Sequence, residues 1–179
     1  MDNLSLAASI RRVADGDMAA LEDIFLTMKD SIYASALVLL GSKQGAEDAV
    51  QETMVEVARC AGQFRGDNAK AWVLRIAHNE AVSFLRKRGR ETPLDESLED
   101  VLGDSGMAAA DGQLGAAELL DSLPQNCREI VVLHVVAGLR HREIAKLLHL
   151  PLGTVCWRYS ESMKILKQIS QSKAKEVFE

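Results

Sequence analysis

Apolar residues recur every three or four positions through most of this 179-residue sequence. One such series is Leu21, Ile24, Phe25, Met28, Ile32, Ala36 and Leu39, and another is Val73, Ile76, Ala77, Ala81, Phe84 and Leu85. This period places apolar side chains on one face of an α-helix, whereas a half-buried strand alternates every second residue. No segment alternates in that way with β-branched enrichment, so we predict an all-α fold.

Residues with known preferences for helix ends divide this pattern into separate helices. We predict helices over residues 4–13, 17–41, 42–62, 67–89, 124–138 and 141–148, and from 152 onward. Asp17 and Ser42 can cap the start of a helix, and Gly41 can end one. Pro124 suits a first helical turn, where its missing N–H is no loss.

Charge is concentrated in the middle of the chain. Residues 93–122 carry eight acidic and no basic side chains, whereas residues 123–179 carry nine basic and five acidic ones. The net charge of −5 therefore does not describe the flanking parts, and the basic C-terminal part can suit a polyanionic partner. We predict two small helical domains, residues 1–92 and 114–179, joined by an acidic linker over 93–113.

Composition and motifs exclude several classes of protein. The 47% of hydrophobic residues can bury a core, and no apolar run reaches the roughly 18 residues of a membrane span. The first ten residues lack the pattern of a secretion signal. The three cysteines, Cys60, Cys127 and Cys156, are scattered and form no CxxC pair, which favours a reduced cytoplasm.

Enzymatic motifs are missing as well. The sequence has no GxSxG, P-loop lysine motif or HExxH. Its four histidines, His78, His134, His141 and His149, are dispersed and lack spacing typical of metal ligands. We therefore expect no enzymatic activity, no cofactor and no metal.

The C-terminal part has the spacing of a helix-turn-helix. Ala145 can sit where two helices cross closely, His149 falls in the turn four residues later, and Val155 can anchor the second helix. His149 occupies the turn position that usually needs glycine, and histidine enters the left-handed region more readily than most residues. The alternative is a plain helical hairpin.

The final helix would then be the recognition helix. Thr154 and Arg158 lie on its non-core sides and could contact DNA. Trp157 is less usual there, and phosphates repel the carboxylate of Glu161. A helix that binds a partner protein is the alternative.

Two further patterns lie in the N-terminal part. Arg75, Asn79 and Arg86 share one helix face near Trp72, which suits phosphate contacts and stacking with a single strand. A charged, solvated helix end is the alternative. Asp48, Gln51 and Glu52 share the face of the preceding helix that lies opposite its apolar side, a pattern that any surface helix can show.

With these motifs in order, the chain resembles bacterial RNA polymerase sigma factors of the extracytoplasmic-function (ECF) subclass. The blocks that carry the resemblance are residues 47–52, 71–79, 84–88, 123–124, 127–129, 138–139, 142–145 and 151–155. Together they span nearly the whole chain.

The resemblance implies three sets of contacts. Asp48, Gln51 and Glu52 would bind the clamp coiled coil of the largest polymerase subunit. Melting and holding the minus-ten strand would fall to Phe64, Arg65, Asn68, Trp72, Arg75, Asn79, Arg86, Lys87 and Arg88. Contacts to the duplex minus-thirty-five element would fall to Arg142, Thr154, Trp157 and Arg158.

The resemblance also implies the polymerase flap as a partner of the second domain, and it suggests an anti-sigma protein that clamps the two domains. Family members usually have lysine and serine at the positions of Cys156 and Trp157. Glu161 and the sparse basic residues of the recognition helix favour one alternative, a sigma-like decoy that binds an anti-sigma protein without touching DNA. Another is an ordinary two-component-style regulator that uses only the second domain.

Overall fold

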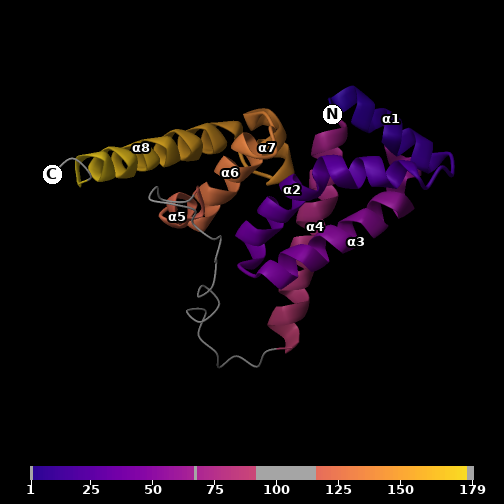
Figure 1. Cartoon of the computed structure of the whole chain (residues 1–179), viewed down its shortest axis with the longest axis horizontal. Coiled ribbons are helices and arrows are strands. Elements are labelled where there is room, and N and C mark those ends of the chain that lie inside the picture. The colour runs from indigo at the N-terminus through magenta and orange to yellow at the C-terminus, as the bar shows by residue number, and fades with distance from the viewer. Residues whose placement is uncertain (1, 67, 92–115, 177–179) are drawn as a thin grey trace. The chain divides into compact units, whose positions relative to one another are not determined.

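The computed structural model describes residues 2–66, 68–91 and 116–176, and every regular element in these ranges is a helix (Figure 1). The all-α prediction is thus confirmed. The chain divides into two compact units, residues 1–104 and 105–179. The predicted acidic linker over 93–113 lies outside the described residues.

The described part of the first unit contains four α-helices and one short 3-10 helix. They are α1 (Asn3–Ala14), α2 (Ala20–Leu40), α3 (Lys43–Cys60), η1 (Ala61–Gln63) and α4 (Ala69–Glu91). Helix α2 packs against α1, α3 and α4, and α3 packs against α4. The large side chains that these helices bury completely are Leu6, Ile10, Ile24, Met28, Ile32, Val57, Val73 and Leu74. This apolar core fixes which faces of α3 and α4 remain outside.

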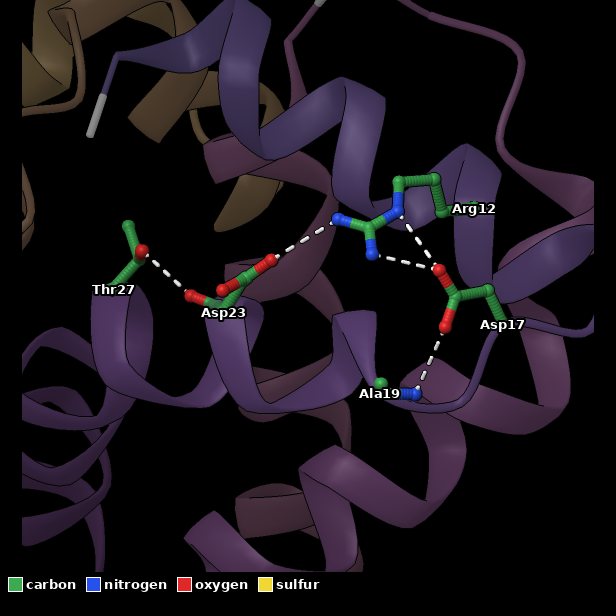
Figure 2. A network of polar contacts seen from close by, with 5 residues as sticks. All are labelled: Arg12, Asp17, Ala19, Asp23 and Thr27. Carbon is green, nitrogen blue, oxygen red and sulfur yellow. Dashed lines mark hydrogen bonds and ion pairs between the residues drawn. The ribbon is translucent and has the colours of Figure 1, made fainter.

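Polar contacts join α1 to the start of α2 (Figure 2). The guanidinium of Arg12 donates to Oδ2 of Asp17 at 2.7 and 2.9 Å and to Oδ2 of Asp23 at 3.3 Å. The other carboxylate oxygen of Asp17 accepts from the backbone N–H of Ala19. The bond from Arg12 is the main reason that the pKa of Asp17 lies below its ordinary value. Asp17 therefore holds the turn before the helix, but the predicted cap is not formed: α2 begins three residues later, and its N-cap residue, Ala19, makes no side-chain hydrogen bond.

The boundary between α2 and α3 follows the predicted capping chemistry. Gly41 adopts a left-handed φ of 63°, and its N–H donates to the carbonyl oxygen of Leu37. The hydroxyl of Ser42 accepts from the N–H of Gly45 at 3.2 Å. At its other end α3 stops at Cys60 rather than at residue 62, because the chain tightens there into the 3-10 turn η1.

Two residues predicted to face inward lie at the edge of the buried stripe instead. Phe25 is 38% exposed and Leu85 is 40% exposed. In α2 the buried positions are Ile24, Met28 and Ile32, which repeat every four residues, so Phe25 falls beside that line. The ammonium of Lys29 lies 5.9 Å from the centroid of the Phe25 ring and covers part of it.

The second unit contains α5 (Ala116–Asp121), α6 (Gln125–Val135), α7 (His141–Leu147) and α8 (Leu152–Glu176). Helices α6, α7 and α8 pack against one another. The completely or nearly completely buried side chains of these helices and of the turn between α6 and α7 are Ile130, Val131, Val132, Leu133, Leu139, Ile144 and Val155. Pro124 precedes α6 as its N-cap, and α6 ends at Val135 rather than at Gly138, which lies in the following turn with φ 72°.

Candidate functional site

Helix α3 presents a polar ridge to solvent. Asp48, Gln51 and Glu52 are all exposed, whereas Ala49 and Thr53 on the opposite side are buried. The spacing of three and four residues brings the three polar side chains onto one face. Two carboxylates and an amide thus stand together on a surface that the core of the unit does not use.

An exposed apolar residue extends this ridge. Val55 is 62% exposed and lies seven residues after Asp48, hence two turns further along the same face. Val55 was not among the residues predicted from the sequence to bind polymerase. Its apolar side chain on the polar side of an amphipathic helix was the signal that could have indicated a contact residue. We define the α3 ridge as Asp48, Gln51, Glu52 and Val55.

Helix α4 carries the predicted basic stripe. Arg75, Asn79, Arg86 and Lys87 are exposed, and Trp72 is half-buried on the turn before Arg75. Lys87 also extends over the ring of Phe84, at 5.9 Å from its centroid. The spacing of Arg75, Asn79 and Arg86 places these side chains on one face of α4 near Trp72, whereas Lys87 lies against Phe84. The side chain of Arg88 lies outside the described residues.

Phe64 is placed differently from a free stacking surface. Its side chain is only 6% exposed, and its ring meets that of Trp72 edge-on at 5.4 Å between centroids. The guanidinium of Arg11, from α1, lies 5.8 Å from the Phe64 centroid on the same ring. Phe64 thus packs against Trp72 from the buried side. Arg11 adds a cation that was not predicted from the sequence, because it belongs to a different helix.

The loop before α4 is organised by side chains. Asn68 accepts at Oδ1 from the N–H of Ala71 at 3.0 Å, so it caps α4. Asn3, which lies 67 residues before Lys70 in the chain, accepts at Oδ1 from the backbone N–H of Lys70 at 3.0 Å. Arg65 is exposed, and its guanidinium donates to the carbonyl oxygen of Gly62 at 2.6 Å. These bonds fix the turn that places Arg65 and Trp72 at one end of α4.

The turn between α7 and α8 has the geometry of a helix-turn-helix. His149 has φ 54°. Among the residues that the structure describes, no other non-glycine residue has a left-handed backbone. The N–H of Leu150 donates to the carbonyl oxygen of Ala145, and that of Leu148 to Ile144. The first of these bonds closes a Schellman-type helix end, which needs a left-handed residue at the position of His149. The predicted turn is confirmed.

The start of α8 exposes a mixed surface. Trp157 is 64% exposed and Arg142, from α7, is also exposed, while Thr154 and Arg158 are half-buried. Glu161, one turn after Trp157, accepts from the ammonium of Lys164 at 3.2 Å. The recognition helix therefore offers one large ring and few unpaired cations.

Three rings from three helices form an aromatic cluster behind this surface. His134 of α6 and His141 of α7 lie 4.5 Å apart between centroids, and Tyr159 of α8 lies 4.7 and 4.8 Å from them. The Sγ atom of Cys156 is 3.6 Å from Nδ1 of His141. Histidines that are dispersed in the sequence are therefore adjacent in space, which the sequence reasoning did not anticipate.

In the ranges that the structure describes, no three His, Cys, Asp or Glu side chains gather in a way that could hold a metal ion. Among the described helices, none combines the length and apolarity needed to cross a membrane.

Comparison with protein families assigns each unit. The family model described as Sigma-70 region 2 matches residues 24–91, which include α3 and α4. The model described as Sigma-70, region 4 matches residues 115–165, which include the helix-turn-helix.

Individual proteins show the same likeness. The chain is 27% identical to the RNA polymerase sigma-H factor of Pseudomonas aeruginosa, over 93% of this chain and 94% of that protein. It is 34% identical to the ECF RNA polymerase sigma factor SigE of Mycolicibacterium smegmatis, over 79% of this chain and 59% of that protein. A solved structure of the sigma factor RpoE with the anti-sigma factor NepR, from Bartonella quintana, aligns with a TM-score of 0.66 at 27% identity, covering 84% and 96% of the two chains.

Proposed function

Because the chain belongs to the sigma-70 family of RNA polymerase sigma factors, in its ECF subclass, we propose that it binds core polymerase and directs it to a subset of promoters. In this role it is a non-enzymatic initiation factor that acts where the polymerase acts, in the cytoplasm. The observation that carries the proposal is the pairing of two surfaces in the first unit, the α3 ridge and the basic stripe of α4.

The α3 ridge is the proposed contact with the clamp coiled coil of the polymerase. Its two carboxylates are exposed and can pair with basic side chains of a partner helix, and Val55 can bury apolar area beside them. Charged pairs of this kind set orientation and partner choice, while the apolar residue supplies area removed from water.

The basic stripe of α4, together with the loop before it, is the proposed surface for the melted minus-ten strand. Arg65, Arg75, Arg86 and Lys87 are exposed cations that can contact successive phosphates. The half-buried Trp72, held by Phe64, offers a ring for an unstacked base. A duplex offers no such unstacked base, so this surface favours the separated strand.

The start of α8 is the proposed contact with the duplex minus-thirty-five element. A helix of this diameter fits the major groove, where Thr154 and Arg158 are placed to contact DNA edges and phosphates. Trp157 is the most exposed large side chain there and can pack on a thymine methyl or a sugar. The same unit is the proposed contact with the polymerase flap.

An anti-sigma protein is a further proposed partner. The likeness to a sigma factor solved together with its anti-sigma factor supports this, at 27% identity. The surfaces that we assign to polymerase and DNA are the ones that such a partner would need to cover.

One assay tests the proposed function. Purified chain is mixed with core polymerase and a promoter library, and heparin-resistant open complexes are recovered and sequenced. We expect a stable complex with core polymerase and enrichment of one class of promoter. A chain that fails to bind core polymerase would sink the proposal and favour the decoy. Binding to core polymerase without promoter enrichment would refute the assignment of α8 to the minus-thirty-five element.

A further inference from the structure

We propose that the aromatic cluster of His134, His141 and Tyr159 positions the recognition helix α8 in a proton-sensitive way, so that acidification loosens α8 from α6 and α7. This inference rests on the proposed function, because that function gives α8 its role in DNA contact. The cluster itself lies behind the DNA-facing residues and is assigned no contact with DNA.

The first step is that the cluster joins helices α6, α7 and α8 of the second unit. Each of the three rings comes from a different helix, and each contacts the other two within 4.8 Å between centroids. Tyr159 is the residue through which α8 takes part. It follows Trp157 and Arg158 directly, so a change in the packing of its ring changes the placement of both.

The second step is that a hydrogen bond fixes which ring nitrogen of His134 acts as a donor. Its Nδ1 lies 2.7 Å from the carbonyl oxygen of Leu139. A carbonyl oxygen only accepts, so Nδ1 donates, and this bond ties the end of α6 to the turn before α7. His134 can keep this bond in its neutral form.

The third step is that His141 lacks an oxygen acceptor for the second N–H group that protonation would give its ring. Its Nδ1 faces Sγ of Cys156 at 3.6 Å, and within the described part of the chain its buried Nε2 has no hydrogen-bond partner. A protonated imidazole carries N–H groups on both nitrogens, and a buried N–H without an acceptor is costly. The charge would also stand 4.5 Å from the other imidazole.

The surrounding groups do not offset that charge. The titratable groups in contact with His141 are His134 from α6 and Cys156 and Tyr159 from α8. Its chain neighbours Arg140 and Arg142 are cations, as is Arg158 beside Tyr159. The nearby carboxylate of Glu143 accepts from the backbone N–H of Arg140 at 2.7 Å and is engaged in the capping of α7.

The sign of the pH dependence follows. Burial, and secondly the neighbouring His134, lower the pKa of His141 from its ordinary value of 6.5. The unfolded domain therefore binds more protons than the folded one in this range. The stabilisation of the folded domain by neutral His141 is therefore fully present above pH 6.5. It is lost as the pH falls through the lowered pKa that His141 has in the folded domain. The loss approaches about tenfold in the folding equilibrium for each unit by which the pKa is lowered.

The test uses the whole chain without polymerase or DNA, so its failure is distinct from failure of the proposed function. Histidine ring protons are titrated by NMR from about pH 7.5 to about pH 5. Amide exchange of α6–α8 is followed over the same range, corrected for intrinsic exchange, with α3 as internal reference. We expect His141 to titrate below 6.5, and protection of α8 to fall more than that of α3.

Variants separate titration from packing. His141→Phe keeps a ring but no proton, so protection of α8 should lose its pH dependence relative to α3. His134→Gln removes one cause, so His141 should titrate closer to its ordinary pKa. His149→Gly removes an exposed histidine of the same domain and should leave the pH dependence unchanged.

A His141 that titrates at or above 6.5 would overturn the proposal, as would equal pH dependence of α8 in the wild type and in His141→Phe. If His141→Phe fails to fold, the wild-type titration and the shift in His134→Gln decide alone. Once holoenzyme has selected a promoter, the wild type should lose occupancy relative to His141→Phe at the acidic end.

Discussion

At the scale of single residues, several side chains have roles that depend on one specific contact. Phe64 is buried under Trp72, and Asn68 caps the helix that carries Trp72. His149 holds a left-handed turn that most residues would resist. Each of these residues positions a surface to which we assign a proposed contact, without forming its outermost part.

Replacement of Phe64 should affect stability before it affects DNA contact. Phe64→Ala removes a ring that is 6% exposed, and we expect the free energy of unfolding of the first unit to fall by about 3 kcal/mol. Urea denaturation measures this change. Trp72→Ala is the comparison. Because this ring is only half-buried, its removal should lower the free energy of unfolding less than Phe64→Ala does, and it should reduce open-complex formation more. Equal stability losses for the two variants would contradict the assignment.

His149→Gly should stabilise the second unit. A side chain at φ 54° carries a steric cost that glycine lacks, and the greater freedom of glycine in the unfolded chain offsets part of it. We expect a net gain of about 1 kcal/mol in the free energy of unfolding. Thermal denaturation checks this expectation. Lys146→Gly, at an exposed position inside α7, should instead destabilise the unit by about 1 kcal/mol.

At the scale of elements, each functional helix divides its circumference between core and partner. The buried side of α3 packs on α2 and α4, which leaves the α3 ridge exposed to solvent. Helix α8 buries Val155 and Ser162, which leaves Trp157 and the pair of Glu161 and Lys164 at the surface.

The triple variant Asp48→Ala, Gln51→Ala and Glu52→Ala should weaken core polymerase binding at least tenfold without unfolding the chain. Loss of about 1.4 kcal/mol at an interface corresponds to that factor, and exposed positions contribute little to folding. Binding is measured by fluorescence anisotropy and folding by circular dichroism. A matched control replaces three exposed side chains outside the ridge, Glu22, Asp30 and Gln44, by alanine and should bind normally. Unfolding of the triple variant would show that the ridge belongs to the core.

Glu161→Lys should strengthen duplex binding by α8. The substitution removes a carboxylate that phosphates repel and releases Lys164 from its ion pair. We expect the slope of log affinity against log salt to steepen by about one for each new phosphate contact. A salt titration with the selected promoter duplex measures that slope. Glu118→Lys, exposed on α5, makes the same charge change away from α8 and should alter the slope less.

At the scale of the whole molecule, the chain consists of two units with separate cores. The helix-turn-helix unit buries its own apolar residues, and the first unit does the same around α2. Separate domains on one chain can engage two DNA elements at raised effective concentration, because binding of one makes binding of the other intramolecular.

The two units should fold when separated. Fragments covering residues 1–92 and 114–179 should give NMR amide spectra that superimpose on those of the whole chain, apart from residues near the cuts. Each fragment retains the buried residues of its own core, so little stabilisation is lost. A fragment that is unfolded alone would show that its core needs the rest of the chain.

Much of the fold was predictable because its signals are local. The apolar period, Ser42 as a cap and Gly41 as a stop act within four or five residues along the chain, and all three are confirmed. The left-handed turn at His149 is equally local. The predicted polymerase-binding residues are exposed, as their spacing on α3 implied. Their binding roles stay predictions.

The sequence by itself determined the helices, their caps, the helix-turn-helix and the family. Tertiary structure alone decided that the ring of Phe64 meets that of Trp72 edge-on and carries the guanidinium of Arg11. It also decided that Phe25 lies at the edge of the core and that His134 contacts His141. The physical reason is that a helix's own period fixes which side chains share a face. Which residues of different helices touch depends on the angle and register at which the helices pack, and many distant side chains set those together.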